Sequence, residues 1–408
     1  MANLIAVKAT RTGLLLYNAG MQTEAVQPST VANSPDTRSR PQLPGLSTAE
    51  LVEQMQAIGQ PAFRAKQVRD WVNKGVTNPV EMRNLPAALQ QELSDHLICS
   101  PLSLIQRQCS EDGTRKYLFK LQGGGNIETV LIPDTSRSTV CVSSQLGCVL
   151  DCPFCHTGTQ RFSGNLTAGE IVAQVLAVKN DLRREPLSND LHAEVTHVVY
   201  MGMGEPLANE AGVYNSLRLL MDEQGLNLSR RRITVSTSGL VPQIGRLGET
   251  TPVNLAISLH AGSDALRDEL VPINRKYPLA ELRMALDTYP LPTQRHITLE
   301  YVMLAGVNDR DEDLDALARF VNPERERVNL IHFNAWPGSP YAGSAMQHMN
   351  SFAKELIKKG IRATVRRSRG DDIMAACGQL KSHLDLGDAT SARGIADIAN
   401  ANKHKAGE

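Results

Sequence analysis

Three cysteines, Cys148, Cys152 and Cys155, lie in one short stretch with the spacing C-x3-C-x2-C. Thiolate-rich sites select zinc or iron–sulfur clusters. A structural zinc site normally has four ligands in two pairs, but no second pair lies nearby, so His156 would have to complete it. A 4Fe-4S cluster usually takes four cysteines, and three leave one iron open to a substrate. The spacing favours such a cluster over a zinc site or a set of unrelated buried thiols.

An aromatic residue, Phe154, directly precedes the last of these cysteines. In this feature and in its spacing, the stretch resembles the three-cysteine loop of the radical S-adenosylmethionine (SAM) enzymes. The resemblance implies one 4Fe-4S cluster on Cys148, Cys152 and Cys155, whose open iron chelates the amino and carboxylate groups of SAM. An injected electron then cleaves SAM to a 5′-deoxyadenosyl radical. The loop alone indicates only the superfamily.

Glycines and polar residues follow several apolar stretches. Gly202-Met-Gly-Glu-Pro206 follows one that ends at Met201. Glycine lets the backbone approach a ligand, and a carboxylate suits an ammonium group, but a glycine turn after a strand is commonplace. Beside a three-cysteine loop, the segment resembles the one that binds the SAM amino group, which implies contacts from Gly204 and Glu205. Polar residues at strand ends are by themselves more often caps or turns. The same resemblance implies further SAM contacts at Ser236, Ser258, Leu259, His260 and Asn334.

Two further cysteines stand apart from the motif. Cys141 lies seven residues before it, and Cys377 lies beside Gly378 after a basic run. A lone cysteine is usually a small buried hydrophobe, and we expect this of Cys99 and Cys109. A thiolate near cations is instead a reactive nucleophile, so Cys377 is a candidate for covalent chemistry.

The residues near these two cysteines carry a more specific resemblance. Cys141-Val-Ser-Ser-Gln145 and Arg369-Gly-Asp-Asp372 resemble the bacterial adenine-C2 RNA methyltransferase family called RlmN, over about Leu46 to about Leu384. The resemblance implies that 23S ribosomal RNA and tRNA are substrates. Adenine C2 is electron-poor, so nucleophilic attack on a SAM methyl is not open to it, whereas a carbon radical can add there.

The resemblance also implies a sequence of steps that uses two SAM molecules per turnover. Cys377 takes a methyl group from the first, and the radical from the second removes hydrogen from that S-methyl. The methylene radical adds to C2, Glu128 accepts the C2 proton, and Cys141 forms a disulfide with Cys377 to release the product. An external donor such as flavodoxin or ferredoxin supplies electrons. Without the resemblance, Glu128 would be a solvent-facing strand carboxylate.

The elements that position these residues can be predicted from patterning. Ser47 and Glu50 form a capping box before an apolar helical face, and further helices are predicted at 65–74 and 86–97. They form a small helical accessory domain with Trp71 as a core anchor. Two alternating stretches, 115–121 and 127–133, flank Gly123-Gly-Gly125 and predict a β-hairpin. Basic residues of the second helix, Arg64, Lys66, Arg69 and Lys74, are RNA-contact candidates or a solvated face.

After residue 139, short apolar strands alternate with helices, which predicts a parallel sheet. The radical SAM resemblance implies an α/β fold with a partial (β/α)6 barrel, whose chemistry lies at the carboxyl ends of the strands. The predicted strands are 195–201, 232–236, 253–258, 297–303, 328–333 and 361–366, and the predicted helices are 167–182, 211–223, 279–288, 309–320 and 344–359.

We therefore divide the chain into five parts. A disordered leader (1–43) precedes the helical, RNA-binding accessory domain (44–100), the β-hairpin extension (101–138), the catalytic barrel (139–384) and a disordered tail (385–408). The leader's acid-poor start permits a transit peptide, but we favour a start codon assigned upstream of Met21 as the simpler account.

Composition limits the partners. Lys and Arg total 43, as do Asp and Glu, so an RNA surface must come from local clusters such as Arg362, Arg366, Arg367 and Arg369. Seven cysteines, three of them in one loop, do not form a secreted disulfide framework and fit a reducing cytoplasm. No apolar run approaches a membrane span, and we expect a monomer. A buried radical site requires the target base to be flipped out of its stack.

Three alternative functions stay open at this point. A sister family methylates adenine C8 of the same ribosomal RNA with the same cysteines. A zinc-stabilised RNA-binding module would do no chemistry. A radical SAM enzyme for small molecules would leave the accessory domain and the Cys141/Cys377 pair without a role.

Overall fold

The computed structural model describes residues 40–188, 190–292 and 294–382. The dominant element is a ten-stranded sheet with the order β1-β2-β3-β4-β7-β8-β9-β10-β11-β12. The first four strands pair antiparallel, and from β4 onward each strand pairs in parallel with the next one. The strands are β1 (Leu102–Cys109), β2 (Arg115–Leu121), β3 (Asn126–Pro133), β4 (Ser138–Cys141), β7 (Val195–Tyr200), β8 (Ile233–Thr237), β9 (Asn254–Ser258), β10 (Ile297–Met303), β11 (Glu326–His332) and β12 (Ala363–Arg366).

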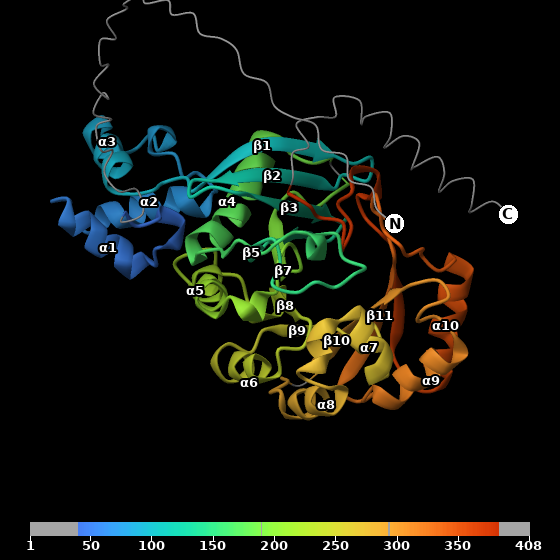
Figure 1. The fold of residues 1–408 in the computed structure, drawn as a ribbon. Helices are drawn as coiled ribbons and strands as arrows, with labels where there is room; N and C mark the ends of the chain where they lie inside the picture. Colours follow the sequence, from blue (N-terminus) through green and yellow to red (C-terminus); the bar gives the residue numbers. More distant parts are fainter. Residues whose placement is uncertain (1–39, 189, 293, 383–408) are drawn as a thin grey trace, which may run out of the picture. The chain divides into compact units, whose positions relative to one another are not determined.

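Helices separate the parallel strands, as a partial (β/α)6 barrel requires, and the predicted fold is confirmed. Several of these helices lie around the outside of the strands (Figure 1). Because β1 and β12 are the two ends of the strand order, the sheet is open between them. The helices are α4 (Ala168–Arg184), α5 (Glu210–Met221), α6 (Val241–Thr250), α7 (Asp264–Leu270), α8 (Leu279–Thr288), α9 (Asp311–Phe320) and α10 (Met346–Lys358).

Two of these helices, α6 and α7, were not predicted from the sequence. α6 contains Pro242, Gly245 and Gly248, and proline and glycine have the lowest intrinsic helix propensities. Pro242 is compatible with the helix because it lies in the first turn, where its missing N–H costs no hydrogen bond. α7 has only seven residues, too few to show a clear helical period.

The strand β10 shows why the barrel strands consist mainly of apolar residues. All seven of its residues are buried, because the barrel interior covers one face and helices cover the other. Glu300 lies in the middle of this strand and is only 5% exposed. Burying a carboxylate is costly unless it is paired, so its presence here points to a role in the barrel interior.

The N-terminal helical region begins with a short 3-10 turn, Leu43–Gly45, and continues with α1 (Thr48–Ala57), α2 (Phe63–Asn73) and α3 (Ala87–His96). The predicted capping box is present, with the Ser47 side chain accepting from the N–H of Glu50. Residues 40–43, which we assigned to the leader, belong to this region, since the N–H of Leu43 donates to the carbonyl of Ile98. Residues 1–39 and 383–408 lie outside the described residues.

Trp71, which we predicted to anchor the core, packs against the core only from its edge. It is only partly buried, its indole N–H donates to Asn84, and Lys74 lies over its ring. The core of the helical region is aliphatic. Its buried side chains include Leu51, Met55, Val68, Leu89 and Leu93.

The predicted hairpin is present as β2 and β3, and it extends the barrel sheet because β3 also pairs with β4. An edge strand, β1, precedes it. β1 was missed because its mostly exposed sequence lacks alternation. Cys109 lies on β1 and is exposed, so the prediction of a buried Cys109 was wrong, whereas Cys99 is partly buried and burial raises the pKa of its thiol to about 12.

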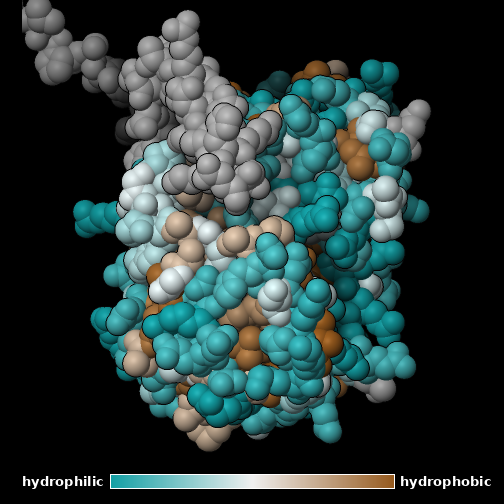
Figure 2. Space-filling view, turned by 90° about the vertical axis from the view of Figure 1, so that its right-hand side faces the viewer, coloured by the Kyte–Doolittle hydropathy of each residue, from teal (hydrophilic) through white to brown (hydrophobic). Residues whose placement is uncertain are grey.

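The face of the molecule in Figure 2 is mostly hydrophilic, and hydrophobic side chains occur there in small separate groups. Within the described ranges, we find no helix whose length and hydropathy would allow it to traverse a bilayer.

Candidate active site

A cavity at the carboxyl ends of the barrel strands brings most of the predicted site residues together. We call it the cluster cavity. Its wall includes the three motif cysteines, residues that follow β7, β8 and β9, and residues of the C-terminal segment. The predicted site residues in this wall are Cys148, Cys152, Cys155, Gly204, Glu205, Ser236, Ser258, His260 and Cys377.

The loop that carries the three cysteines is tightly folded. A short two-stranded pair, β5 (Gln145–Leu146) with β6 (Gly164–Asn165), closes its base. Gly147 has φ +72°, and a Cβ there would lie 2.5 Å from the carbonyl oxygen of Arg161. The N–H of Cys155 donates to the carbonyl of Cys152. This backbone holds the cysteines at the cavity wall.

The chemistry of these donors fits an iron–sulfur cluster. Burial raises the pKa of the Cys148 thiol to about 12 and that of Cys152 well above its ordinary value. Thiolates are therefore stable in this pocket only beside a cationic group such as cluster iron. Across the described ranges, no three His, Cys, Asp or Glu side chains converge as ligands of a single metal ion. In a cluster, by contrast, each thiolate binds a different iron.

Glu205 is held rigidly in the cavity wall. It is 3% exposed, and its two carboxylate oxygens accept from the N–H groups of Ser238 (2.8 Å) and Leu207 (3.1 Å). Gly204 before it has φ +99°, and a Cβ there would lie 2.5 Å from the Gln145 side chain. Burial raises the pKa of Glu205. A buried carboxylate at this wall suits a cationic ligand group.

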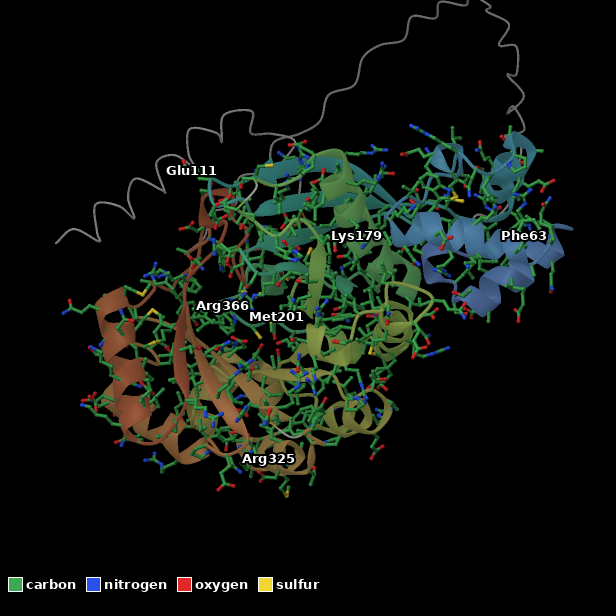
Figure 3. All side chains as sticks on the ribbon, turned by 180° about the vertical axis from the view of Figure 1, so that it is seen from behind. Phe63, Glu111, Lys179, Met201, Arg325 and Arg366 are labelled. Carbon is green, nitrogen blue, oxygen red and sulfur yellow. The ribbon has the colours of Figure 1, made fainter. Side chains whose placement is uncertain are left out.

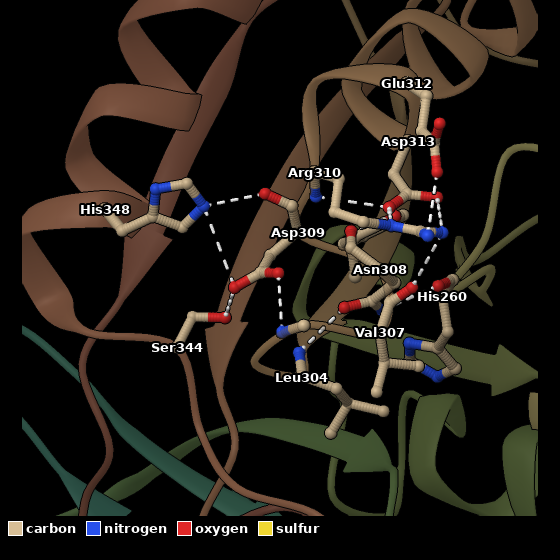
Figure 4. Close-up of polar contacts among 12 residues, drawn as sticks. His260, Leu304, Val307, Asn308, Asp309, Arg310, Glu312, Asp313, Ser344 and His348 are labelled. Atoms are coloured by element: carbon tan, nitrogen blue, oxygen red, sulfur yellow. Dashed lines mark hydrogen bonds and ion pairs between the residues drawn. The ribbon is translucent and has the colours of Figure 1, made fainter.

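The side chain of Asn308 holds the loop after β9 in place (Figure 4). The Asn308 amide donates to the carbonyl oxygens of His260 (2.9 Å) and Val302 (2.7 Å), and its oxygen accepts from the N–H of Leu304. His260 has φ +59°, and its Nδ1 accepts from the N–H of Val302. Burial lowers the pKa of His260 to about 3, so the ring is neutral.

Leu259 differs from its neighbours, because its side chain is fully buried in the hydrophobic core rather than lining the cavity. Its main-chain N–H donates to the carbonyl of Glu300. Any ligand contact at this position therefore has to come from the backbone.

A second cavity lies behind Cys377. Cys141 and Asn334 line it, and Cys377 and Arg366 line both cavities. Cys141 and Cys377 are both free thiols, so the implied disulfide is not formed in this structure. Asn334 lies away from the other predicted SAM contacts, and its amide oxygen accepts from the Ser368 hydroxyl. Met201 and Arg366, both labelled in Figure 3, lie in the barrel interior.

The residues on either side of Cys377 are fastened to other elements. We call residues 369–382 the Cys377 segment. Before Cys377, Asp372 accepts from the Ser110 hydroxyl and from the N–H of Glu111 in the β1–β2 turn. After Cys377, the N–H of His156 donates to the carbonyl of Gly378 at 2.7 Å. His156 contacts the segment a second time through its ring, whose Nδ1 lies 3.2 Å from the carbonyl oxygen of Gln379, and the ring stacks on Trp336 at 4.7 Å.

Glu128 lies in the wall of neither cavity. It is 5% exposed on β3, and one carboxylate oxygen accepts from the N–H of Lys381 at 2.8 Å. The other lies 3.4 Å from Nζ of Lys116. The solvent-facing position expected from the strand pattern alone was wrong, because the Cys377 segment covers this face of the hairpin. Burial raises the pKa of Glu128.

Two residues of the site, Glu300 and Arg366, were not predicted to belong to it. Glu300 lines the cluster cavity, and its Oε2 has no hydrogen-bond partner among the described residues. A charged residue inside an otherwise apolar strand was the signal that could have revealed it. Arg366 was grouped with the surface cations Arg362, Arg367 and Arg369, which are exposed, but it lines both cavities.

The basic residues proposed for RNA contact in the helical region also differ in their exposure. Lys66 on α2 and Lys74 just after it are exposed, but Arg69 is buried, and its guanidinium donates to the carbonyl of Leu46. Arg69 therefore belongs to the core of the helical region and is not available to RNA.

Comparisons with known proteins agree with this geometry. Residues 142–321 match the radical SAM superfamily, and residues 42–99 match the ribosomal RNA large subunit methyltransferase N-terminal domain. The dual-specificity RNA methyltransferase RlmN of Paracoccus denitrificans is 45% identical over 368 residues, covering 88% of this chain and 94% of that protein. The protein of the same name from Rhodopseudomonas palustris strain BisB5 is 47% identical, covering 85% and 91%.

A solved structure is similar to this chain in both fold and sequence. The crystal structure of a radical SAM methyltransferase from Sphaerobacter thermophilus has a TM-score of 0.79 and 43% sequence identity, and it covers 84% of this chain and 100% of that one. The sequence identity, the matched N-terminal domain and the cavity between Cys148, Cys152, Cys155 and Cys377 lead to one conclusion: the chain belongs to the RlmN family of radical SAM enzymes.

Proposed function

We propose that this chain methylates C2 of an adenine in 23S ribosomal RNA and of an adenine in tRNA anticodon loops. The observation that carries the proposal is the position of Cys377. It lies in the wall shared by two cavities, with the cluster cysteines lining one cavity and Cys141 lining the other. A thiol that accepts a methyl group from SAM in one cavity and later forms a disulfide with a second thiol in the other needs this placement. The names of the relatives, dual-specificity RNA methyltransferases, support RNA as the substrate.

Cys148, Cys152 and Cys155 would hold the 4Fe-4S cluster. When bound, the cluster supplies the electron that cleaves SAM and so provides radical chemistry to the cavity. Glu205 binds the SAM ammonium group with its buried carboxylate, since both oxygens are already oriented by main-chain N–H groups. Other contacts to SAM come from Ser236, Ser258 and His260, and from the backbone of Leu259. Asn334 contacts SAM from the second cavity, which Cys377 also lines.

The chain's own residues carry the remaining steps. The Cys377 sulfur accepts a methyl group from one SAM, and a second SAM is consumed for the radical step, so each turnover uses two. Glu128 receives the proton that C2 loses. Cys141 then attacks the Cys377 sulfur: the disulfide bond forms, the bond between that sulfur and the transferred carbon breaks with its electron pair going to the carbon, and the carbon takes up a proton to become the methyl group. An external donor such as flavodoxin or ferredoxin then reduces the disulfide and restores both thiols. The hydrogen bond from Lys381 to Glu128 has to open before Glu128 reaches the base.

The surroundings fit an RNA substrate. The helical region and the exposed arginines Arg362, Arg367 and Arg369 provide phosphate contacts, and the target adenine is flipped into the cavity. We place the enzyme in the cytoplasm, acting as a monomer.

The first test is anaerobic purification with reconstituted iron and sulfide, followed by mass spectrometry of the Cys377 peptide and of digested RNA. We expect a brown protein, an S-methyl group on Cys377 and 2-methyladenosine in the RNA. Cys377→Ala should lose RNA methylation while keeping its iron, and Cys148→Ala should lose the iron. A colourless zinc protein with unmodified Cys377, or 8-methyladenosine as the product, would overturn the proposal.

A further inference from the structure

The side chain of Lys116 lies at the junction of the hairpin and the Cys377 segment. It comes from β2, and its ammonium group is 3.4 Å from Oε1 of Glu128 on β3. In the hairpin register Lys116 pairs with Val130 and Glu128 pairs with Leu118, so the two side chains are diagonal neighbours on one face. The Lys116 and Glu128 side chains are 11% and 7% exposed, so solvent screens their interaction little.

The two members of this pair contact the Cys377 segment on opposite sides of Cys377. The ammonium group of Lys116 donates to the carbonyl of Met374 at 3.3 Å, three residues before Cys377. Glu128 accepts from the N–H of Lys381 at 2.8 Å, four residues after it. Met374 has φ +51°, an uncommon conformation for a residue with a side chain, so an external contact helps to hold it.

Lys116 supplies the charge that opposes the burial of Glu128. Burial raises the pKa of the Glu128 carboxyl, and the charge of Lys116 followed by the Lys381 N–H lowers it. The other described side chains that hydrogen-bond to Glu128 are uncharged and contact its backbone: Met203 accepts the Glu128 N–H through sulfur, and Ser143 donates to the Glu128 carbonyl. A proton acceptor must be ionised before it acts, so a charge of this kind bears directly on the proton-transfer step.

We propose that Lys116 is a positioning residue for proton removal from adenine C2, which keeps Glu128 ionised and in register with the Cys377 segment. This inference rests on the proposed function. In the step concerned, the C2–H bond breaks, its proton passes to a Glu128 carboxylate oxygen, and the electron pair stays on the base. The carboxylate becomes neutral, and Lys116 keeps its charge throughout.

The test uses the reconstituted full-length enzyme with a tRNA transcript. Three variants are compared with the wild type: Lys116→Met removes the charge, Lys116→Arg keeps it, and Lys120→Met is the matched control. Lys120 lies on the same face of β2 but is exposed. Methylation of Cys377 is measured by mass spectrometry, and the RNA–protein adduct is followed on denaturing gels across a range of pH.

We expect Lys116→Met to methylate Cys377 normally but to resolve the adduct more slowly at neutral pH, because loss of the Lys116 charge raises the pKa of Glu128 and lowers its ionised fraction. The loss of rate reaches about tenfold for each unit by which that pKa rises above the pH of the assay. The rate of this variant should recover at higher pH, and Lys116→Arg and Lys120→Met should resemble the wild type. Adduct resolution by Lys116→Met at the wild-type rate, or an equal loss of both steps with an unshifted pH profile, would overturn the inference. Failure of the wild type to methylate Cys377 would instead refute the proposed function.

Discussion

Gly147 and Gly204 show how single residues shape the cluster cavity. Both have positive φ, and at both a Cβ would lie 2.5 Å from a neighbouring atom. At Gly147 the added Cβ would contact a backbone atom, the carbonyl oxygen of Arg161, which cannot rotate away as a side chain can. Substitution at Gly147 therefore has to displace the loop that carries the cysteines.

At this scale we expect Gly147→Ala to lose most of its reconstituted iron while the rest of the fold persists. The measurements are iron content per chain and the thermal unfolding midpoint. Gly124→Ala is the matched control, because Gly124 also has positive φ (+95°) but has open space around its Cβ position. Full iron loading of Gly147→Ala would show that the loop accommodates the extra carbon.

Among the elements, β1 and the hairpin are attached to α4 largely through Asp181, beside a second ion pair between Arg107 and Glu185 at the end of that helix. Asp181 on α4 lies 2.7 Å from Arg107 of β1 and 2.7 Å from Arg115 of β2, and it accepts from the Tyr117 hydroxyl. Burial raises the pKa of Asp181, but these hydrogen bonds, with that of Tyr117 the strongest, outweigh it and leave the pKa below its ordinary value. The hairpin face opposite Asp181 carries Glu128, so this attachment orients the site.

We expect Asp181→Asn to destabilise the protein by about 2 kcal/mol at neutral pH, since it leaves the largely buried Arg115 without a counter-charge. A lowered carboxyl pKa stabilises the fold above the unfolded-state value, near 3.9, and this contribution is lost as the pH falls through the folded-state pKa. Denaturant unfolding of wild type and variant should therefore give curves that converge at acidic pH. A difference independent of pH would contradict this ionic role for Asp181.

At the scale of the whole molecule, the Cys377 segment joins parts of the chain that are distant in sequence. The β1–β2 turn holds it through Asp372, and the cluster loop holds it through His156. The loop after β11 contributes as well, because the Gln379 amide donates to the carbonyl of Ala335. Cys377 is thus positioned by contacts on both sides and not by its own secondary structure.

Loss of the contact at Asp372 should loosen the segment. We expect Asp372→Ala to raise the alkylation rate of Cys377 by iodoacetamide several-fold and to lower RNA methylation. Asp371→Ala is the neighbouring control, since among the described residues the Asp371 side chain makes no hydrogen bond. Equal alkylation rates in the two variants would show that the contact at Asp372 does not position Cys377.

Features that depend on residues close together in the chain could be predicted before the structure. The spacing of Cys148, Cys152 and Cys155 indicated a cluster site, and the alternation of apolar strands and helices indicated a parallel barrel. These patterns are local, because helix and strand periods repeat within a few residues. Where local signals were weak, as in β1 and α7, the elements were missed.

The tertiary structure alone decided which distant side chains meet. It placed Cys377 in a wall shared with Cys141, turned Arg366 into the barrel, and buried Glu128 against Lys116 and the Cys377 segment. Strand register and the path of the C-terminal segment set these neighbours, and neither leaves a periodic trace in the sequence. A charged residue looks the same in a sequence whether it faces solvent or a cavity, because burial depends on what packs over it.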